Sequence, residues 1–242
     1  MKTRWWMIAV VMLVCACGNN DSAAVTEPAD DLGIKSAEQK RKENLAMIAD
    51  AKPLIQDGDL ILRSGTDFSS EQIKLISKKD RTYSHGGIAF RRNGEVYVYH
   101  VISDYYHKND KVFAEKLDSF CNPASNLGFA VARYDLDSAE VGRFHQYLDK
   151  QVRDKVAFDM RFDIRTNDSL YCSEMIAKGL KQATNGRLQL EIGKFGDRSM
   201  YKVIKQHLKL TDKELDGREI VPIDHLFLHP QCQVLKRYVY EQ

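Results

Sequence analysis

The sequence lacks several features that would assign it to a particular class of protein. It has no block of Lys or Arg residues, and its formal net charge is only +2, so a nucleic-acid partner is not indicated. The apolar run at residues 5–14 is too short for a usual transmembrane helix. No internal repeat is evident. What remains is a globular composition, with 43% hydrophobic and 29% charged residues in a chain of 242, enough for one domain of ordinary size plus extras.

Cysteine is scarce and unevenly placed. Cys15 and Cys17 lie in the N-terminal leader, so Cys121, Cys172 and Cys232 are the cysteines of the main part of the chain. Three is an odd number, which predicts at least one free thiol in an exported protein. Whether Cys121 and Cys232 pair is left open. No Cys-x-x-Cys spacing occurs among the three, so a structural zinc site of that kind is not indicated, and we expect no cofactor.

The N-terminus has the pattern of an export signal. Two basic residues precede the apolar run, and residues 1–16 are predicted to be a signal peptide. The run ends in Val-Cys-Ala-Cys, which resembles the lipobox of bacterial lipoproteins, with Cys17 as the lipidated first residue of the mature chain. Residues 17–35 are polar and small, as in a flexible tether. We therefore expect a lipid-anchored protein of the cell envelope, outside the cytoplasmic membrane; the alternative is a plain secretory signal with incidental cysteines.

Helical and strand patterns follow one another through the rest of the chain, which favours an α+β fold. Residues 36–56 are predicted to be an N-terminal helical arm, with Ser36 as the helix N-cap, and residues 57–242 the main domain. Residues 104–123 are predicted to be a loop, and residues 158–167 either a loop or an edge strand. Beyond the hairpin discussed next, the expected helices begin at Ser69 or Ser70 and cover residues 138–152, 169–182, 199–207 and 224–228, and the expected strands cover residues 59–62, 129–134 and 234–240.

A β-hairpin is the clearest local prediction. Asn93-Gly94 is a strong turn signal because both positions tolerate positive φ, and residues suited to strands lie on either side of it. If these two residues form the loop, Arg92 faces Glu95 and the whole register follows. A slip by one residue would move every side chain to the other face of the sheet.

This register brings two histidines together. His100 then lies opposite Gly87, and His85 lies diagonally from His100 on the same face of the hairpin. Gly87 has no side chain to fill the space between the rings. The two imidazoles are therefore predicted to be within reach of each other.

Cys172 is the candidate nucleophile. It lies in the first turn of the helix predicted over residues 169–182, where the partial positive charge and the free amides of a helix N-terminus favour a thiolate. A nearby imidazole can accept the thiol proton, and a third polar group can hold that imidazole in the right tautomer. We assign these roles to His85 and His100, and the Cys172 amide to part of an oxyanion hole.

These stretches resemble the circularly permuted papain-like hydrolases of the YiiX/YaeF type, within the NlpC-like superfamily. That family shows a Gly-Asp-hydrophobic opening, a Ser-His-x-Gly strand and a Tyr-Cys-Ser-Glu helix start, with the histidine before the cysteine. The resemblance implies an antiparallel sheet packed against a central helix that bears the cysteine, with Cys172 as nucleophile and His85 as base. It extends over about residues 57–228, and its segments are residues 57–62, 84–88, 97–100 and 171–174.

One position departs from the pattern. YiiX-type proteins commonly have a glutamate where this chain has His100. The Cys-His-His set is similar instead to the lecithin–retinol acyltransferase branch of the superfamily, which transfers acyl groups on lipids. The resemblance thus implies a monomeric thiol amidase or peptidase acting on cell-wall peptides, or on acyl amides or esters.

Two other interpretations stay open. Cys172, His85 and His100 are all of zinc-ligand type, although the sequence offers no obvious acidic fourth ligand. The chain could also be a non-catalytic binding lipoprotein that keeps the same fold, because a fold does not determine a function.

Overall fold

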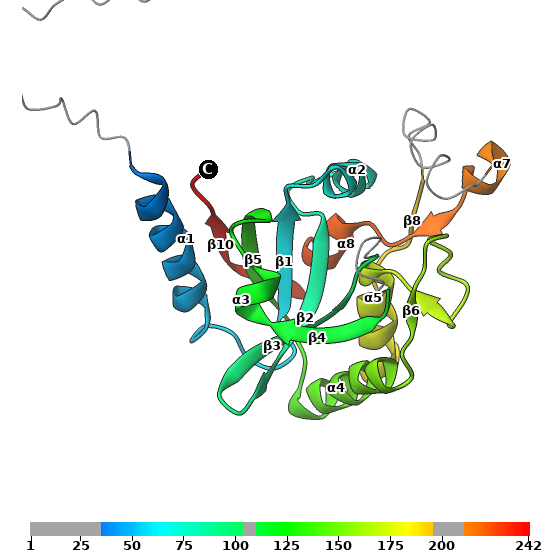
Figure 1. The fold of residues 1–242 in the computed structure, drawn as a ribbon. Coiled ribbons are helices and arrows are strands. Elements are labelled where there is room, and N and C mark those ends of the chain that lie inside the picture. The colour runs from blue at the N-terminus through cyan, green and yellow to red at the C-terminus, as the bar shows by residue number, and fades with distance from the viewer. Residues whose placement is uncertain (1–34, 104–109, 196–210) are drawn as a thin grey trace, which may run out of the picture. The chain divides into compact units, whose positions relative to one another are not determined.

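A six-stranded antiparallel sheet organises the chain in the computed structural model, which describes residues 35–103, 110–195 and 211–242. The strand order is β10-β5-β1-β2-β3-β4, so the hairpin β2–β3 lies between β1 and the edge strand β4 (Figure 1). This large antiparallel sheet with helices is an α+β fold, as predicted. The six strands are β1 (Leu60–Gly65), β2 (His85–Arg92), β3 (Glu95–Val101), β4 (Val112–Lys116), β5 (Asn126–Tyr134) and β10 (Cys232–Val239).

The hairpin has the predicted turn and register. Asn93 and Gly94 both have positive φ, of 52° and 82°, which is the conformation that an Asn-Gly turn supplies at low cost. The paired residues run from Arg92 opposite Glu95 to Ile88 opposite Tyr99. The pairing ladder ends there, so His85 and His100 lie beyond the last paired residues of the two strands.

Helices cover both faces of the sheet (Figure 1). Alternate residues of β1 and β2, such as Leu60 and Ile88, face a core shared with α4 and α5, whereas Ile61 and Ala89 face a second core shared with α1 and α3. The helices are α1 (Ala37–Ala51), α2 (Phe68–Ile76), α3 (Leu117–Phe120), α4 (Ser138–Arg153), α5 (Cys172–Ala183), α7 (Asp212–Leu215) and α8 (Ile223–Phe227).

The helix boundaries follow their capping residues. Ser36 caps α1 as predicted, and its hydroxyl accepts the Gln39 N–H at 3.2 Å. The start predicted for the second helix is wrong by one to two residues: α2 begins at Phe68, and Asp67 is its N-cap, because the Asp67 carboxylate accepts the Ser70 N–H at 3.0 Å. A carboxylate at this position also complements the helix dipole, so Asp67 is preferred over the serines that follow it.

The loop predicted over residues 104–123 is also wrong in part. Residues 112–116 form β4 and residues 117–120 form α3, while residues 104–109 are outside the described part of the chain. β4 pairs with β3 along its whole length, from Val112 opposite Val101 to Lys116 opposite Tyr97. β4 is short, lies at the sheet edge and is only half buried. Its charged residues therefore hide the alternation of apolar and polar residues that would have predicted a strand.

The remaining elements are short. Residues 157–158 form β6 (Ala157–Phe158), which pairs in parallel with β7 (Ser169–Leu170), and β8 (Gly193–Lys194) pairs with β9 (Glu219–Ile220). The central helix therefore starts three residues later than the predicted residue 169. The helix predicted over residues 199–207 lies outside the described residues. Among the helices that the structure does describe, none is long and apolar enough to cross a bilayer.

All three cysteines of the main domain are free thiols. Cys121 is buried in the core beneath α1 and α3, whereas Cys232 packs against the core on the other face of the sheet. The open question of their pairing is thus answered, because the sheet separates them.

Candidate active site

Cys172 is the first residue of α5, so it lies in the first helical turn as predicted, although the helix begins at residue 172 and not at residue 169. Tyr171 before it is extended, with φ −93° and ψ 165°, and its N–H donates to the Glu174 carboxylate at 3.1 Å. This contact satisfies one backbone donor at the helix start and fixes where the helix begins. The helix therefore presents Cys172 at its N-terminus, near free amide groups.

Val221, far along the chain, forms hydrogen bonds with the residues on either side of Cys172. The Ser173 hydroxyl donates to the Val221 carbonyl at 2.6 Å, and the Val221 N–H donates to the Tyr171 hydroxyl at 3.0 Å. Tyr171, Ser173 and Val221 are all buried. Two buried hydrogen bonds to one residue restrict the position of the nucleophile without touching its sulfur.

The Cys172 sulfur lies beside the start of β2. The backbone N–H of Gly86 is directed at it, as is that of Ser173. Because β2 and β3 stop pairing at Ile88 opposite Tyr99, the Gly86 amide is not used in a ladder with β3. The backbone N–H of Gly86, the residue after His85, is therefore available to the sulfur at the open end of the hairpin.

The two histidines contact each other directly. His85 Nε2 and His100 Nδ1 are 3.0 Å apart, and the ring centroids are 5.1 Å apart. Both rings pack on Phe120, with centroid distances of 5.6 Å for His85 and 5.0 Å for His100. His85 retains 8% exposure and His100 none, so the first ring is at the surface of the site and the second is behind it.

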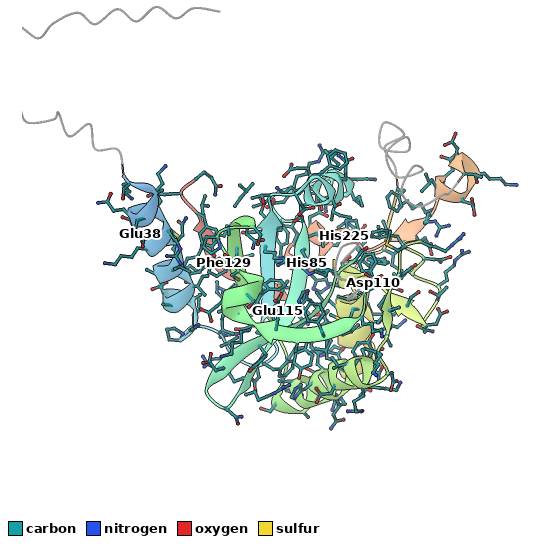
Figure 2. All side chains as sticks on the ribbon, in the orientation of Figure 1. Glu38, His85, Asp110, Glu115, Phe129 and His225 are labelled. Carbon is teal, nitrogen blue, oxygen red and sulfur yellow. The ribbon has the colours of Figure 1, made fainter. Side chains whose placement is uncertain are left out.

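Glu115 is a third member of this chain of polar groups, and the sequence analysis missed it. His100 Nε2 lies 2.9 Å from Glu115 Oε1, and Glu115 reaches the ring from β4. The contact lies off the N–H axis of the ring, so its attraction is mainly electrostatic. His85 and Glu115, the first and last members of this series of polar groups, are labelled in Figure 2.

The sulfur and the imidazoles approach the open end of the hairpin from opposite faces of the sheet. Cys172 belongs to the core beneath α5, whereas His85 and His100 pack on Phe120, which belongs to the core beneath α1 and α3. Among the residues that the structure describes, no hydrogen bond joins the sulfur to either ring. The Gly86 amide links the two sides, and Nδ1 of His85 is the ring nitrogen that His100 does not occupy.

Burial governs protonation in this site. It raises the pKa of Cys172 to about 11, although the N–H groups of Gly86 and Ser173 and the charge of Arg63 act in the other direction. It also holds the pKa of His85 well below its usual value, as do the charges of Arg63 and His100. The resting pair is therefore a thiol and a neutral imidazole, and the expected preference for a thiolate at the helix N-terminus is outweighed by desolvation.

Arg63 is a positive charge that acts on Cys172 and on both histidines. It lies opposite His85 in the register between β1 and β2, and its guanidinium carbon is 4.6 Å from the centroid of the Phe120 ring. One of its nitrogens donates to the Phe120 carbonyl at 3.0 Å. This position gives a cation that stabilises negative charge on the Cys172 sulfur.

Cys172, His85 and His100 are not arranged as a metal site. Within residues 35–103, 110–195 and 211–242, no group of three or more His, Cys, Asp or Glu side chains is arranged to hold a metal ion. His85 and Glu115 engage both ring nitrogens of His100, so this histidine could bind a metal only after one of these contacts had been broken.

The fold has a known relative among solved structures. No protein-family model and no curated protein matches the chain. The structure of the metalloprotein YiiX from Escherichia coli O157:H7 superposes on it with a TM-score of 0.62 and 21% sequence identity, over 75% of this chain and 97% of the YiiX chain. The chain has a YiiX-like fold. At this identity the likeness to YiiX concerns the architecture, and the term metalloprotein applies to YiiX itself.

Proposed function

We propose that the chain is a thiol hydrolase of the permuted papain-like, NlpC-like kind, with Cys172 as nucleophile, His85 as general base and His100 as the group that orients His85. The observation that supports this proposal best is the paired imidazoles, 3.0 Å apart, at the hairpin opening where the Gly86 amide meets the sulfur. Cys172 and His85 each keep 8% exposure, and the proposal requires a substrate carbonyl to reach both groups through this small exposed area. The YiiX-like fold is consistent with this arrangement.

The reaction begins with a neutral pair, so proton transfer accompanies attack. The thiol proton of Cys172 moves to Nδ1 of His85 as the sulfur forms a bond to the acyl carbon and the carbonyl electrons move to oxygen. Backbone N–H groups at the start of α5, including that of Cys172, stabilise this oxyanion. The intermediate then expels an amine or alcohol, which takes the proton from His85 and leaves an acyl-enzyme.

Water completes the cycle. His85 accepts a proton from a water molecule as its oxygen attacks the acyl carbon, the carbon–sulfur bond breaks, and the same proton returns to the sulfur. No cofactor takes part in this scheme. The substrates that it suits are small peptides of the cell wall, or acyl amides and esters of lipids.

The proposed setting is the cell envelope. A lipid on Cys17 would anchor the chain outside the cytoplasmic membrane, with residues 17–35 as a tether and the domain acting as a monomer. Cys17 and the tether lie outside the described residues, so this part of the proposal depends on the lipobox-like sequence. Metabolic labelling with a palmitate analogue tests it, since the label should be lost from Cys17→Ser.

Acylation by an activated ester tests the catalytic proposal. We expect p-nitrophenyl butyrate to add one butyryl group to Cys172, detected by peptide mass spectrometry, and to release p-nitrophenolate beyond the first equivalent. Cys172→Ala and His85→Gln should abolish this turnover. Cys232 is the internal control, because it is more exposed than Cys172 and lies in β10 instead of at a helix N-terminus.

Each alternative predicts a different result. If Cys232 or Cys121 is acylated before Cys172, the catalytic proposal is wrong. A binding protein that keeps the fold would show no release beyond a single equivalent. Zinc that copurifies at one equivalent per chain and is lost from both Cys172→Ala and His85→Gln would favour a metal site instead.

A further inference from the structure

We infer that Glu115 is a positioning residue, which holds the His100–His85 pair in the tautomer that leaves Nδ1 of His85 free to accept the Cys172 proton. This inference rests on the proposed function for its catalytic meaning. Its structural content, the placement of two protons, can be measured without any substrate.

The outer contact, between Glu115 and His100, sets the position of the first proton. An ionised carboxylate only accepts hydrogen bonds, and Glu115 Oε1 lies 2.9 Å from His100 Nε2. A bare lone pair on this nitrogen would repel the carboxylate at that distance. Although the carboxylate lies off the N–H axis, its negative charge favours a proton over a lone pair on this nitrogen, so we place the His100 proton on Nε2.

The inner contact, between His100 and His85, sets the position of the second proton. A neutral His100 with its proton on Nε2 has a lone pair on Nδ1, which lies 3.0 Å from His85 Nε2. Only a proton on His85 Nε2 turns this approach into a hydrogen bond. His85 then has its lone pair on Nδ1, which is the state that a general base for Cys172 needs. The choice of tautomer thus passes from Glu115 through His100 to His85.

Burial makes this choice depend on Glu115. His100 is fully buried between Phe113 and Phe120, with ring centroids 4.3 Å and 5.0 Å away, so water cannot replace a lost partner easily. Glu115 retains 25% side-chain exposure at the sheet edge. The carboxylate is therefore held by β4 at the protein surface while its charge acts on an interior ring.

The charges around His100 agree with this role. The groups that face it are His85 on β2, Arg63 on β1 and Glu115 on β4. Burial lowers the pKa of His100, the Glu115 contact raises it and Arg63 lowers it. Among these groups Glu115 is the negative one, so it also stabilises the positive charge that the histidine pair gains when His85 takes the thiol proton.

The position of Glu115 also accounts for the departure at His100. The resemblance leads one to expect a glutamate at that position, directly behind the base. Here an imidazole occupies it, and the carboxylate reaches that imidazole from the next strand outward. The register of β3 and β4 places Glu115 opposite Val98, two residues before His100 on the same strand. A negative charge is therefore still present behind the base, but it comes from Glu115 on β4 and not from β3.

Nitrogen-15 NMR of labelled histidine tests the proton placement directly. At pH 7.5, long-range proton–nitrogen spectra of the wild type should show His85 and His100 both neutral with the proton on Nε2. Glu115→Ala should give a mixture of tautomers at His100. The matched control is Glu95→Gln, which removes a carboxylate on the neighbouring strand that lies 3.6 Å from Lys116, and should leave both spectra unchanged.

Acylation kinetics give the second measurement. We expect Glu115→Ala to slow the acylation of Cys172 by p-nitrophenyl butyrate by about 10-fold to 100-fold, as loss of a partner behind a histidine typically does, and to move its pH profile. Glu115→Asp should recover part of the rate, and Glu95→Gln should keep all of it.

The two proposals fail in different ways. A proton on Nδ1 of His100 in the wild type, or the same tautomer in Glu115→Ala, overturns the role of Glu115 whatever the kinetics show. An unchanged acylation rate in Glu115→Ala overturns it as well. If the wild type is not acylated at Cys172, the proposed hydrolase is wrong, and the NMR result still decides whether Glu115 sets the tautomers.

Discussion

Gly87 lies directly against His100 across the open end of the hairpin. A Cβ atom on Gly87 would come 3.1 Å from the His100 Cβ, 2.5 Å from Val98 Cγ1 and 2.8 Å from the Tyr99 carbonyl oxygen. The last of these is a backbone atom and cannot turn aside. The absence of a side chain at Gly87 is therefore what allows the two strands and the buried imidazole to pack this closely.

Gly87→Ala should both destabilise the domain and disturb the histidine pair. We expect a loss of about 1–3 kcal/mol in the free energy of unfolding, as for an overpacked core, measured by urea denaturation. Gly142→Ala is the matched control, because nothing lies within 4 Å of its Cβ position in α4. That variant should gain about 0.5–1 kcal/mol from helix propensity. Equal stability of the two variants would contradict the close contact at Gly87.

Glu174 should make stability depend on pH in the neutral range. Burial raises the pKa of Glu174 to about 7, although Lys178 opposes the shift at 2.7 Å. The unfolded chain releases this proton near the ordinary glutamate value, while the folded chain keeps it until about pH 7. The stabilising contribution is thus complete below the unfolded value and is lost as pH rises toward 7, by roughly 3 kcal/mol.

Comparison with Glu174→Gln isolates this effect. The amide keeps an oxygen for the Tyr171 N–H but does not titrate, so the fall between about pH 4.5 and 7 should be absent from its unfolding curves. Glu38→Gln, at a glutamate with 79% side-chain exposure, should retain the wild-type dependence. A parallel fall in wild type and Glu174→Gln would show that another group is responsible.

Arg63→Met should make Cys172 less reactive. Methionine keeps an apolar stem against Phe120 but removes the charge that lowers the pKa of Cys172, so that pKa should rise above about 11. Alkylation by iodoacetamide at pH 8 should slow roughly three- to tenfold, corresponding to one charge acting through a partly buried site. Arg63→Lys should lose much less. Faster alkylation in Arg63→Met would mean that the cation acts mainly on His85 and not on the sulfur.

Much of the fold could be predicted because its signals are local. Asn93-Gly94 fixed the hairpin register, and the register fixed the common face of His85 and His100. The helix that bears Cys172 was also predictable from its amphipathic pattern, but its start was placed three residues too early, at residue 169 instead of Cys172. These features depend on neighbours in the sequence, or on a turn of two residues.

The features of the site that were not predicted depend on contacts between segments far apart in the sequence. Period-two alternation shows which strand residues share a face, but not which face a helix will cover, so the approach of Cys172 from the side opposite the histidines was not predictable. Glu115 was missed because its strand is short and charged. The Val-Phe-Ala triplet before it was the only available signal, and pairing with β3 is what makes it a strand. Desolvation of the thiol likewise requires the complete core around it.

Val221 has a consequence for when the site can form during synthesis. Its amide and carbonyl hold Tyr171 and Ser173, on either side of the sulfur. Translation delivers these two residues well before Val221, so the segment bearing the thiol leaves the ribosome without the bonds that fix it. A chain truncated between Glu174 and Val221 would keep its cysteine and both imidazoles, yet would lack the two hydrogen bonds from Val221 that hold the nucleophile in place.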